Sequence, residues 1–331
     1  MKKNIFKKAF IRISKLMGFE LIDQNEFYSP TLNKEINENL TNLNKSIVFP
    51  LGEVELSRKV SSLMIIFRCN TNIDIWDQNK KRIFEKNKIE YTLRSLNSLI
   101  RAINYFKKNE SLNIKLFILD NGSDKKDIKE ISDLVDKNKV DYELIIHENN
   151  DFKSFIKEQK TEQTFSNLSS LFKCFKLAKE KSDDLIFFVE DDYLHFETLI
   201  EEMINTYERI SSQLKRDLFI CPSDYPYLYM NNQKTNILIG NKRHWRIVDK
   251  SLCTFLTSKK LIEQYWSNFE ETCKDRHEPF EKKINEIYKK EFCISPIQSL
   301  SVHFTNVNSS YGLSPFVDYK SLWDSNSLKN D

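Results

Sequence analysis

Apolar residues in the first two thirds of the chain recur in two alternating patterns. Short apolar runs at 63–67, 114–119, 142–146 and 185–190 predict buried strands. Between them, apolar residues recur every three or four positions over 92–106, 126–135 and 166–179, which predicts amphipathic helices. Strands that alternate with helices indicate an α/β fold, with a mostly parallel central sheet covered by helices on both faces.

The pattern continues less regularly in the last third of the chain. It predicts a helix over 196–210, a strand at 218–221, a strand within 244–256 that returns to the core, and a helix behind Pro279. Residues 299–303 are expected to form a last strand. The chain then turns polar over 305–331, which we interpret as a flap or tail.

The first 17 residues place apolar side chains on one helical face and six basic residues on the other. This basic amphipathic helix is expected either to lie on an anionic membrane surface or to pack against its own domain. Its apolar runs are too short for a signal peptide or a membrane span. Residues 18–57 are polar and are interpreted as a connecting segment.

Composition narrows the choice of function. The net charge of +3 over 331 residues gives no argument for a nucleic acid partner. The six cysteines lie far apart without metal-ligand spacing, which fits reduced thiols in the cytoplasm better than zinc or disulfides. With only five glycines and neither GxGxxG nor GxxxxGK[ST], the chain is neither a dinucleotide-binding dehydrogenase nor a P-loop protein.

The acidic triplet Glu190, Asp191 and Asp192 directly follows the apolar run at 185–189. Carboxylates brought together at a strand end repel one another and favour a bound cation, and oxygen ligands suit Mg²⁺ or Mn²⁺. A solvated acidic turn is the other interpretation.

Ligands of parallel α/β sheets bind outside the carboxyl ends of the strands. Further polar residues are expected at that edge and are candidates for ligand binding: Arg68, Asn70, Asp120, Asn121 and Asn167.

The order of strand, helix, a strand ending in Asp120-Asn-Gly-Ser, and a later strand ending in Glu190-Asp-Asp192 resembles the GT-A fold glycosyltransferases, especially the family 2-like enzymes. The resemblance covers residues 60–305 and implies a nucleotide-sugar-binding half at 58–192 and an acceptor-binding half at 193–304. It implies that Asp120 contacts the nucleoside and that Asp192 binds Mn²⁺ or Mg²⁺. Glu190 and Asp191 would bind the metal or the donor. The first strand ends in Arg68-Cys-Asn70, which departs from the usual family turn.

Two segments of the second half are candidates for substrate binding. The Tyr- and Pro-rich stretch 222–229 suits sugar stacking through Tyr225, with Asp224 accepting hydroxyl groups, although a packed aromatic turn has the same composition. His244, Trp245 and Arg246 could bind phosphate or sugar, whereas a core Trp between surface charges is equally ordinary.

The same resemblance implies a general base before a helix of the second half. Glu278 is the first candidate and Asp275 the second; alternatively, acids at a helix start only answer the helix dipole. His303 is a candidate metal ligand or a structural histidine.

We therefore expect a metal-dependent glycosyltransferase that moves a sugar from a nucleotide-sugar donor to a glycan or lipid-linked acceptor in surface polysaccharide or glycan biosynthesis. An inverting mechanism is favoured. A nucleotidyltransferase and a non-catalytic nucleotide-sugar or carbohydrate-binding protein are the alternatives.

Overall fold

The computed structural model describes residues 5–19, 21, 41–42, 45–48, 52–72, 82–157, 161–230, 234–305 and 309–328. The chain divides into two compact units, Met1–Leu56 and Ser57–Asp331. The predicted halves 58–192 and 193–304 share one continuous sheet within the second unit.

The first unit contains helix α1 (Ile5–Leu16) and a small antiparallel sheet of β1 (Thr41–Asn42), β2 (Lys45–Val48) and β3 (Gly52–Glu55). The helix agrees with the predicted one from residue 5 onward; residues 1–4 lie outside the described part of the chain. The sheet was not predicted. Its strands of two to four residues are too short to give a clear alternation of apolar and polar positions.

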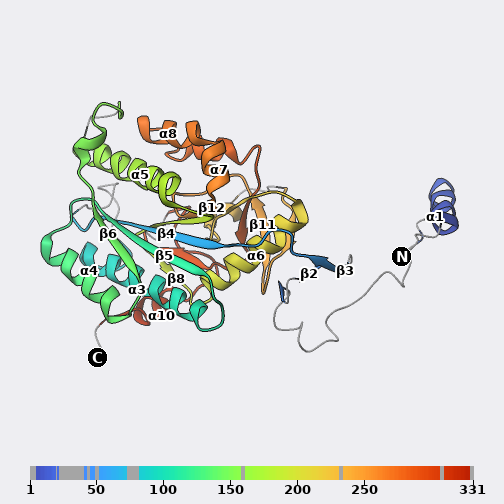
Figure 1. The fold of residues 1–331 in the computed structure, drawn as a ribbon, viewed down its shortest axis with the longest axis horizontal. Helices are drawn as coiled ribbons and strands as arrows, with labels where there is room; N and C mark the ends of the chain where they lie inside the picture. Colours follow the sequence, from blue (N-terminus) through green and yellow to red (C-terminus); the bar gives the residue numbers. More distant parts are fainter. Residues whose placement is uncertain are drawn as a thin grey trace. The chain divides into compact units, whose positions relative to one another are not determined.

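The second unit is organised around a central sheet, which has nine strands among the described residues, in the order β10-β11-β13-β9-β12-β7-β4-β5-β6 (Figure 1). β12 and β11 run opposite to the other strands. The sheet is thus mostly parallel, as predicted. Its strands are β4 (Ser62–Cys69), β5 (Asn113–Asp120), β6 (Tyr142–Ile146), β7 (Leu185–Glu190), β9 (Phe219–Ile220), β10 (Ile237–Ile239), β11 (His244–Val248), β12 (Phe255–Ser258) and β13 (Cys293–Pro296).

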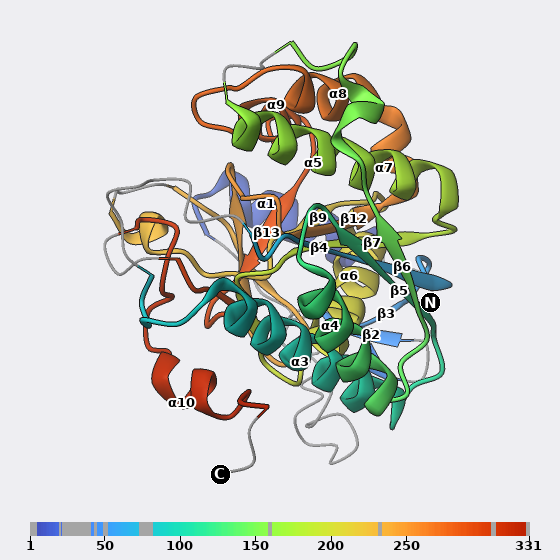
Figure 2. The same cartoon turned by 90° about the vertical axis from the view of Figure 1, so that its left-hand side faces the viewer.

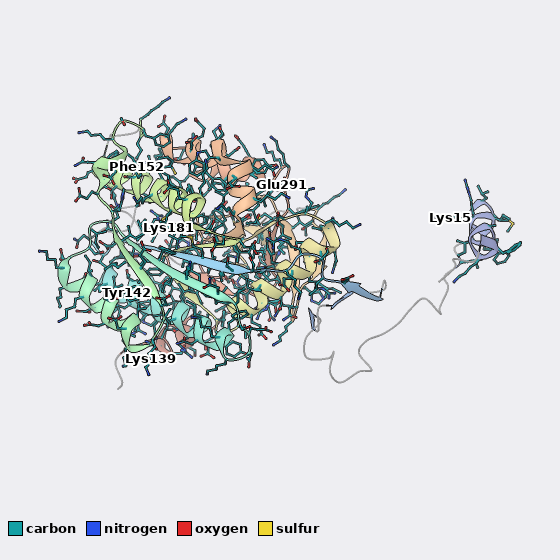
Figure 3. The ribbon with its side chains drawn as sticks, viewed as in Figure 1. Lys15, Lys139, Tyr142, Phe152, Lys181 and Glu291 are labelled. Carbon is teal, nitrogen blue, oxygen red and sulfur yellow. The ribbon has the colours of Figure 1, made fainter. Side chains whose placement is uncertain are left out.

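Helices cover both faces of this sheet (Figures 1 and 2). One face packs against α3 (Lys88–Lys107), α4 (Lys125–Lys137) and α6 (Leu199–Leu214), and the other against α5 (Glu162–Lys181), α7 (Lys259–Gln264), α8 (Trp266–Lys274) and α9 (Lys282–Ile287). Successive residues of β4 alternate between the two cores, with Ile65 in the first and Ile66 in the second. Phe152, labelled in Figure 3, joins the second core edge-on to Phe172 of α5, at 4.9 Å between ring centroids. It belongs to the 3₁₀ turn η3 (Asn149–Phe152).

A separate two-stranded ribbon follows the acidic triplet. β8 (Tyr193–His195) pairs antiparallel with β14 (Ser301–His303). Behind it, Trp323 of α10 (Tyr319–Asp324) stacks on Phe84 with ring centroids 4.5 Å apart and contacts Tyr91 in a tilted arrangement at 4.6 Å. The predicted tail at 305–331 therefore contributes a helix and a buried aromatic side chain to the second unit.

Three predicted element boundaries need correction. The segment 244–256 forms two strands, β11 and β12, because residues 249–254 leave the sheet between them. The helix expected from residue 196 begins at Leu199. The helix expected directly behind Pro279 begins at Lys282, so the acidic residues before the proline belong to a loop rather than to a helix terminus. A second 3₁₀ turn, η4 (Pro226–Tyr229), occupies the Tyr- and Pro-rich stretch.

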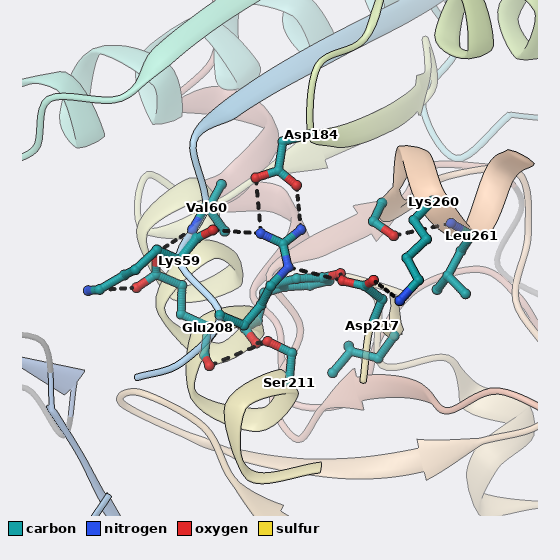
Figure 4. A network of polar contacts seen from close by, with 12 residues as sticks. Lys59, Val60, Asp184, Glu208, Ser211, Asp217, Lys260 and Leu261 are labelled. Atoms are coloured by element: carbon teal, nitrogen blue, oxygen red, sulfur yellow. Dashed lines mark hydrogen bonds and ion pairs between the residues drawn. The ribbon is translucent and has the colours of Figure 1, made fainter. Parts of the chain in front are cut away.

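The amino-terminal ends of β4 and β7 are joined by a polar network (Figure 4). Arg58 donates to both carboxylate oxygens of Asp184 and, through Nε at 3.1 Å, to Asp217. Glu208 of α6 accepts from the Val60 backbone N–H at 2.8 Å. These contacts hold β4 beside β7 at their amino-terminal ends. They therefore help to set the register of the two strands.

Among the described residues, no helix combines the length and apolarity needed to cross a membrane. All six cysteines are buried free thiols.

Candidate functional site

The carboxyl ends of β4, β5 and β7 lie side by side. The strand register pairs Cys69 with Asp120 and Arg68 with Glu190, so residues far apart in the sequence meet at one edge. A cavity of about 630 Å³ opens at this edge. Its lining includes most of the residues predicted for donor and metal binding: Arg68, Asn70, Asn121, Asn167, Glu190, Asp191, Asp192 and His303. We call this space the strand-end cavity.

Asp120 lies behind the wall of this cavity rather than in its lining. Its side chain is buried, and it accepts hydrogen bonds from the backbone N–H groups of Gly122 and Ser123, each at 3.2 Å. Gly122 has a φ of +99°, a left-handed conformation that favours glycine. Burial raises the pKa of Asp120, although these hydrogen bonds oppose the rise. In this structure Asp120 shapes the turn that carries Asn121.

Each acid of the triplet has a cationic partner. Arg68 Nη2 lies 2.6 Å from Glu190 Oε1, Lys88 Nζ contacts Asp191, and His303 Nε2 lies 3.2 Å from Asp192 Oδ2. These partners come from β4, α3 and β14. The three carboxylates lie at the end of β7, and their mutual repulsion is relieved by groups of the protein itself.

Arg68 and Asp191 make further contacts that fix their positions. Arg68 Nη1 donates to Asn167 Oδ1 at 2.5 Å and to Ser170 Oγ at 3.1 Å. Asp191 Oδ2 accepts from Thr92 Oγ1 at 2.8 Å. Lys88 was missed by the sequence analysis, because a lysine at the start of a helix rich in surface charge gives no signal of a buried partner.

The Asp192 and His303 side chains form a tightly coupled pair. His303 Nδ1 donates to the Tyr311 carbonyl at 2.8 Å, and its ring stacks on Tyr193 with centroids 4.6 Å apart. Burial alone would raise the pKa of Asp192, but His303, Lys88 and Arg68 lower it well below its usual range. Burial likewise opposes protonation of His303, and Asp192 reverses this and raises the pKa of the imidazole.

One carboxylate oxygen of Asp192 accepts no hydrogen bond within the described part of the chain. Asp192 Oδ1 is buried and has no hydrogen-bond partner among the described residues. A buried carboxylate oxygen without a partner is costly, and a divalent cation would satisfy it. The described residues contain no preformed cluster of three metal-ligating side chains. The donor set of Asp192, Glu190 and His303 fits a hard cation once their present partners are displaced.

The two predicted general bases lie in different surroundings. Glu278 lines the strand-end cavity, but its side chain is 80% exposed and lies 3.2 Å from Arg276. Asp275 is exposed and is absent from the lining; it accepts from the adjacent backbone N–H of Arg276 at 2.9 Å.

Glu281 is a third acid, which the sequence analysis missed. It is buried, lines the strand-end cavity and immediately precedes α9. Burial, together with the nearby charge of Glu190, raises the pKa of Glu281 to about 8. The sequence analysis placed the helix start at Pro279 and therefore treated Glu281 as a residue within the helix. In the structure the helix begins three residues later, and Glu281 lies at its amino-terminal boundary.

The other predicted substrate-binding residues lie outside the strand-end cavity. Asp224 is buried with Arg246 Nη2 at 2.6 Å and Tyr229 Oη at 2.6 Å. These three groups form a separate cluster that attaches η4 to β11. His244, at the start of β11, is exposed.

Two aromatic predictions need correction. Trp245 is fully buried and donates from Nε1 to Glu202 at 3.3 Å. A Cβ added at Gly240 would lie 2.1 Å from Trp245 Nε1, so the indole already fills the available space. Tyr225 is 1% exposed and its hydroxyl lies 2.7 Å from that of Tyr193. Both rings are core residues and have no face left for a sugar.

No protein-family model matches the chain, and neither does any curated protein. Among solved structures, it is similar to galactosyltransferase LgtC in complex with donor and acceptor sugar analogues, at 11% identity and a TM-score of 0.36, covering 69% of this chain and 70% of that one. It is also similar to the glycosyltransferase GlyE of Streptococcus pneumoniae TIGR4, at 10% identity and a TM-score of 0.42, covering 82% of this chain and 61% of that one. A complex of UDP-glucose pyrophosphorylase with UDP-glucose matches at 8% identity and a TM-score of 0.36, covering 75% and 91%. With such low identities and TM-scores, the function has to be argued from the site itself.

The coupling of Asp192 to His303 predicts a pH dependence of stability in the metal-free protein. Because the folded-state pKa of His303 is raised, its stabilisation is complete below the unfolded pKa of about 6.5 and is lost as the pH rises through the folded value. We expect His303→Gln to remove about 1 to 2 kcal/mol near pH 6 and progressively less at higher pH.

Urea unfolding in EDTA, from about pH 5.5 to 9, measures this difference. The raised pKa of Glu281 also lowers stability over the same range, so the quantity to follow is the difference between wild type and His303→Gln at each pH. A difference that stays constant with pH would contradict the coupling.

Proposed function

We propose that the protein is a metal-dependent glycosyltransferase of the GT-A type, which transfers a sugar from a nucleotide-diphosphate sugar to an acceptor hydroxyl. The observation that carries the proposal is the acidic triplet at the carboxyl end of β7, where Asp192 lines the strand-end cavity and its buried Oδ1 has no partner among the described residues. The cavity volume of about 630 Å³ suits a small-molecule donor. A nucleotide diphosphate needs cationic and amide groups, which this lining provides.

The residues of the strand-end cavity suggest how a donor is held. Arg68 and Lys88 provide positive charge beside the triplet, and Asn70, Asn121 and Asn167 provide amide groups. Glu190 and Asp191 complete the donor side. Asp192, with Glu190 and His303, would hold Mn²⁺ or Mg²⁺, whose chemistry when bound is to neutralise the charge that develops on the leaving nucleoside diphosphate.

The acceptor hydroxyl must lose its proton as the new bond forms, and a carboxylate in the cavity can accept it. Among the candidates, we favour Glu281, because it is buried in the lining and its raised pKa makes its carboxylate, once deprotonated, a stronger base than an exposed carboxylate. Glu278 remains the second candidate and Asp275 the third. A carboxylate base that acts directly on the acceptor fits an inverting reaction.

We further propose that the enzyme works in the cytoplasm in surface polysaccharide or glycan biosynthesis, and that α1 attaches it to an anionic membrane carrying a lipid-linked acceptor. Six free thiols suit a reducing compartment. Phe6, Phe10 and Leu16 of α1 are exposed, with exposed fractions of 85%, 63% and 84%. Lys7, Arg12 and Lys15 on the same helix supply positive charge, as Lys15 illustrates in Figure 3.

Asp192→Asn tests the metal proposal. The amide keeps the shape of the side chain but loses its charge, so we expect Mn²⁺-dependent binding of a nucleoside diphosphate to fall by at least about tenfold, the change that 1.4 kcal/mol produces. Calorimetry with UDP and GDP, with Mn²⁺ and with EDTA, measures it. Asp318→Asn is a matched control, because Asp318 caps α10 outside this cavity. Unchanged Mn²⁺-dependent binding in Asp192→Asn would overturn the metal site.

Glu281→Gln tests the base. Donor binding should stay near wild type, whereas turnover should fall by roughly 10²- to 10⁴-fold, the usual effect of losing a general base. Glu278→Gln and Asp275→Asn are the matched variants, assayed for sugar release and transfer with a panel of nucleotide sugars. If Glu278→Gln loses turnover while Glu281→Gln keeps it, Glu278 is the base. Activity in all three variants would exclude a base on this loop.

Membrane attachment is tested with the double variant Phe10→Ser/Leu16→Ser. Removing two exposed apolar side chains should reduce co-sedimentation with phosphatidylglycerol vesicles by at least about tenfold, because each buried apolar side chain contributes about 1.5 to 3 kcal/mol. Phosphatidylcholine vesicles are the control for charge. Equal sedimentation of wild type and variant would show that α1 does not bind the bilayer.

A further inference from the structure

A second cavity, of about 700 Å³, lies between the start of α6, the loop before β14 and the segment before α10. It shares no lining residue with the strand-end cavity. Its volume falls within the range typical of ligand pockets. We call it the α6 cavity.

Backbone strain is concentrated at this cavity. In the described part of the chain, four residues other than glycine have positive φ: Lys139, Lys215, Gln298 and Phe316. Lys215 caps the end of α6, and Lys139 follows the end of α4, where left-handed residues are ordinary. Gln298 (φ 70°) and Phe316 (φ 59°) have no helix end to account for them, and both line the α6 cavity. Strain of this kind persists at functional sites when the surrounding structure holds it in place.

The strained Phe316 is also the most exposed large apolar side chain among the described residues, at 98%. A phenylalanine in the left-handed region is unfavourable, and full exposure of its ring adds the loss of hydrophobic burial. The Phe316 ring therefore makes no evident contribution to the stability of the fold. A flat apolar surface held at the rim of a cavity suits stacking against a ring-shaped ligand.

Polar groups in the same lining as Phe316 remain available for hydrogen bonds. Arg243 uses Nη1 for the carbonyls of Gln298 and Ser299, at 2.8 and 3.3 Å, and its Nη2 and Nε have no partner among the described residues. The Gln298 side chain is exposed in the same lining. Deeper in the lining, His195 is 2% exposed, with Nδ1 2.7 Å from Ser301 Oγ and Nε2 unpartnered.

The charges of the lining distinguish between classes of ligand. Arg101 is paired with Glu197, and the lining contains one further base, Arg243, and one further acid, Asp318, so its four charged residues sum to no net charge. A nucleotide or other phosphorylated ligand would need an excess of positive charge, from the protein or from a bound cation such as the one proposed at Asp192. A lipid chain would need an apolar lining, whereas Arg243 and Gln298 present polar groups. A pyranose ring needs both an aromatic surface for its C–H face and planar polar groups for its hydroxyls.

We propose that the α6 cavity is a saccharide-binding site, in which a pyranose ring stacks on Phe316 and its hydroxyl groups bond to Arg243 and Gln298. The site goes beyond the transfer reaction proposed above and does not depend on it. His195 lies three residues after Asp192 along β8, a separation of roughly 10 Å in an extended strand, so the two cavities lie at opposite ends of the β8 and β14 ribbon.

The test uses the full-length protein on a printed array of defined oligosaccharides, followed by calorimetry with the glycan that binds best. Phe316→Gly and Gln298→Gly each remove one ligand contact and also relieve a left-handed strain, so we expect at least a tenfold loss of affinity with an unchanged or raised Tm. Lys139→Gly, labelled by its residue in Figure 3, is the matched control: it relieves the same strain away from both cavities and should bind as wild type.

One further variant separates this site from the strand-end cavity. Asp192→Asn should bind the glycan as wild type, with and without EDTA, even if it fails to bind a nucleoside diphosphate. Each of four results would overturn the proposal. These are no glycan bound by the wild type, wild-type affinity in both Phe316→Gly and Gln298→Gly, glycan binding lost in Asp192→Asn alone, and displacement of the glycan by inorganic phosphate.

Discussion

The requirement that dominates this structure is the compensation of three consecutive carboxylates at the carboxyl end of β7. Unpaired buried carboxylates are too costly to tolerate, so each must meet a cation. Arg68 comes from the neighbouring strand, Lys88 from the first residue of α3, and His303 from the last residue of β14. These positions span more than two hundred residues of sequence, and they converge only if the sheet order, the start of α3 and the ribbon behind the triplet are all correct. The three charge pairs, and the strand-end cavity that they line, therefore form only when these elements are correctly arranged.

The opposite end of the same strands is fixed by the same kind of interaction. Asp184, just before β7, pairs with Arg58, just before β4, and Asp217 joins them. Between the two charged ends, β4 and β7 are almost entirely apolar and buried. Hydrophobic burial supplies most of the stability but specifies register weakly when both faces of a strand are apolar. Charge pairs at both ends exclude a slipped register, because a shift of one residue would leave a carboxylate without its partner.

The elements that the sequence predicted well are those whose patterns are local. The strands that carry Arg68, Asp120 and Glu190 were found because each is a continuous apolar run that ends in polar residues. The errors concern residues whose environment depends on distant segments. In the sequence, Trp245 and Tyr225 resemble ligand-binding aromatic residues. In the structure, their polar atoms form hydrogen bonds with Glu202 and Tyr193, respectively. Lys88 and Glu281 carry no local signal, since Lys88 pairs with Asp191 and Glu281 lies near the charge of Glu190, and both partners lie about a hundred residues away in the sequence. Periodicity reports which face of an element is buried, but it does not report which polar groups meet there.

The balance of charge at the triplet also bears on the order of events in the proposed reaction. When His303 is protonated in the metal-free protein, three acids face three cations, so the triplet as a whole attracts a nucleoside diphosphate only weakly. A divalent ion at Asp192 would need the neutral form of His303, because a protonated imidazole cannot act as a ligand. Replacing the proton of His303 by a divalent cation would raise the net charge of the site by one. Metal and diphosphate would therefore strengthen each other's binding, and by linkage the free energy of this coupling is the same in both directions.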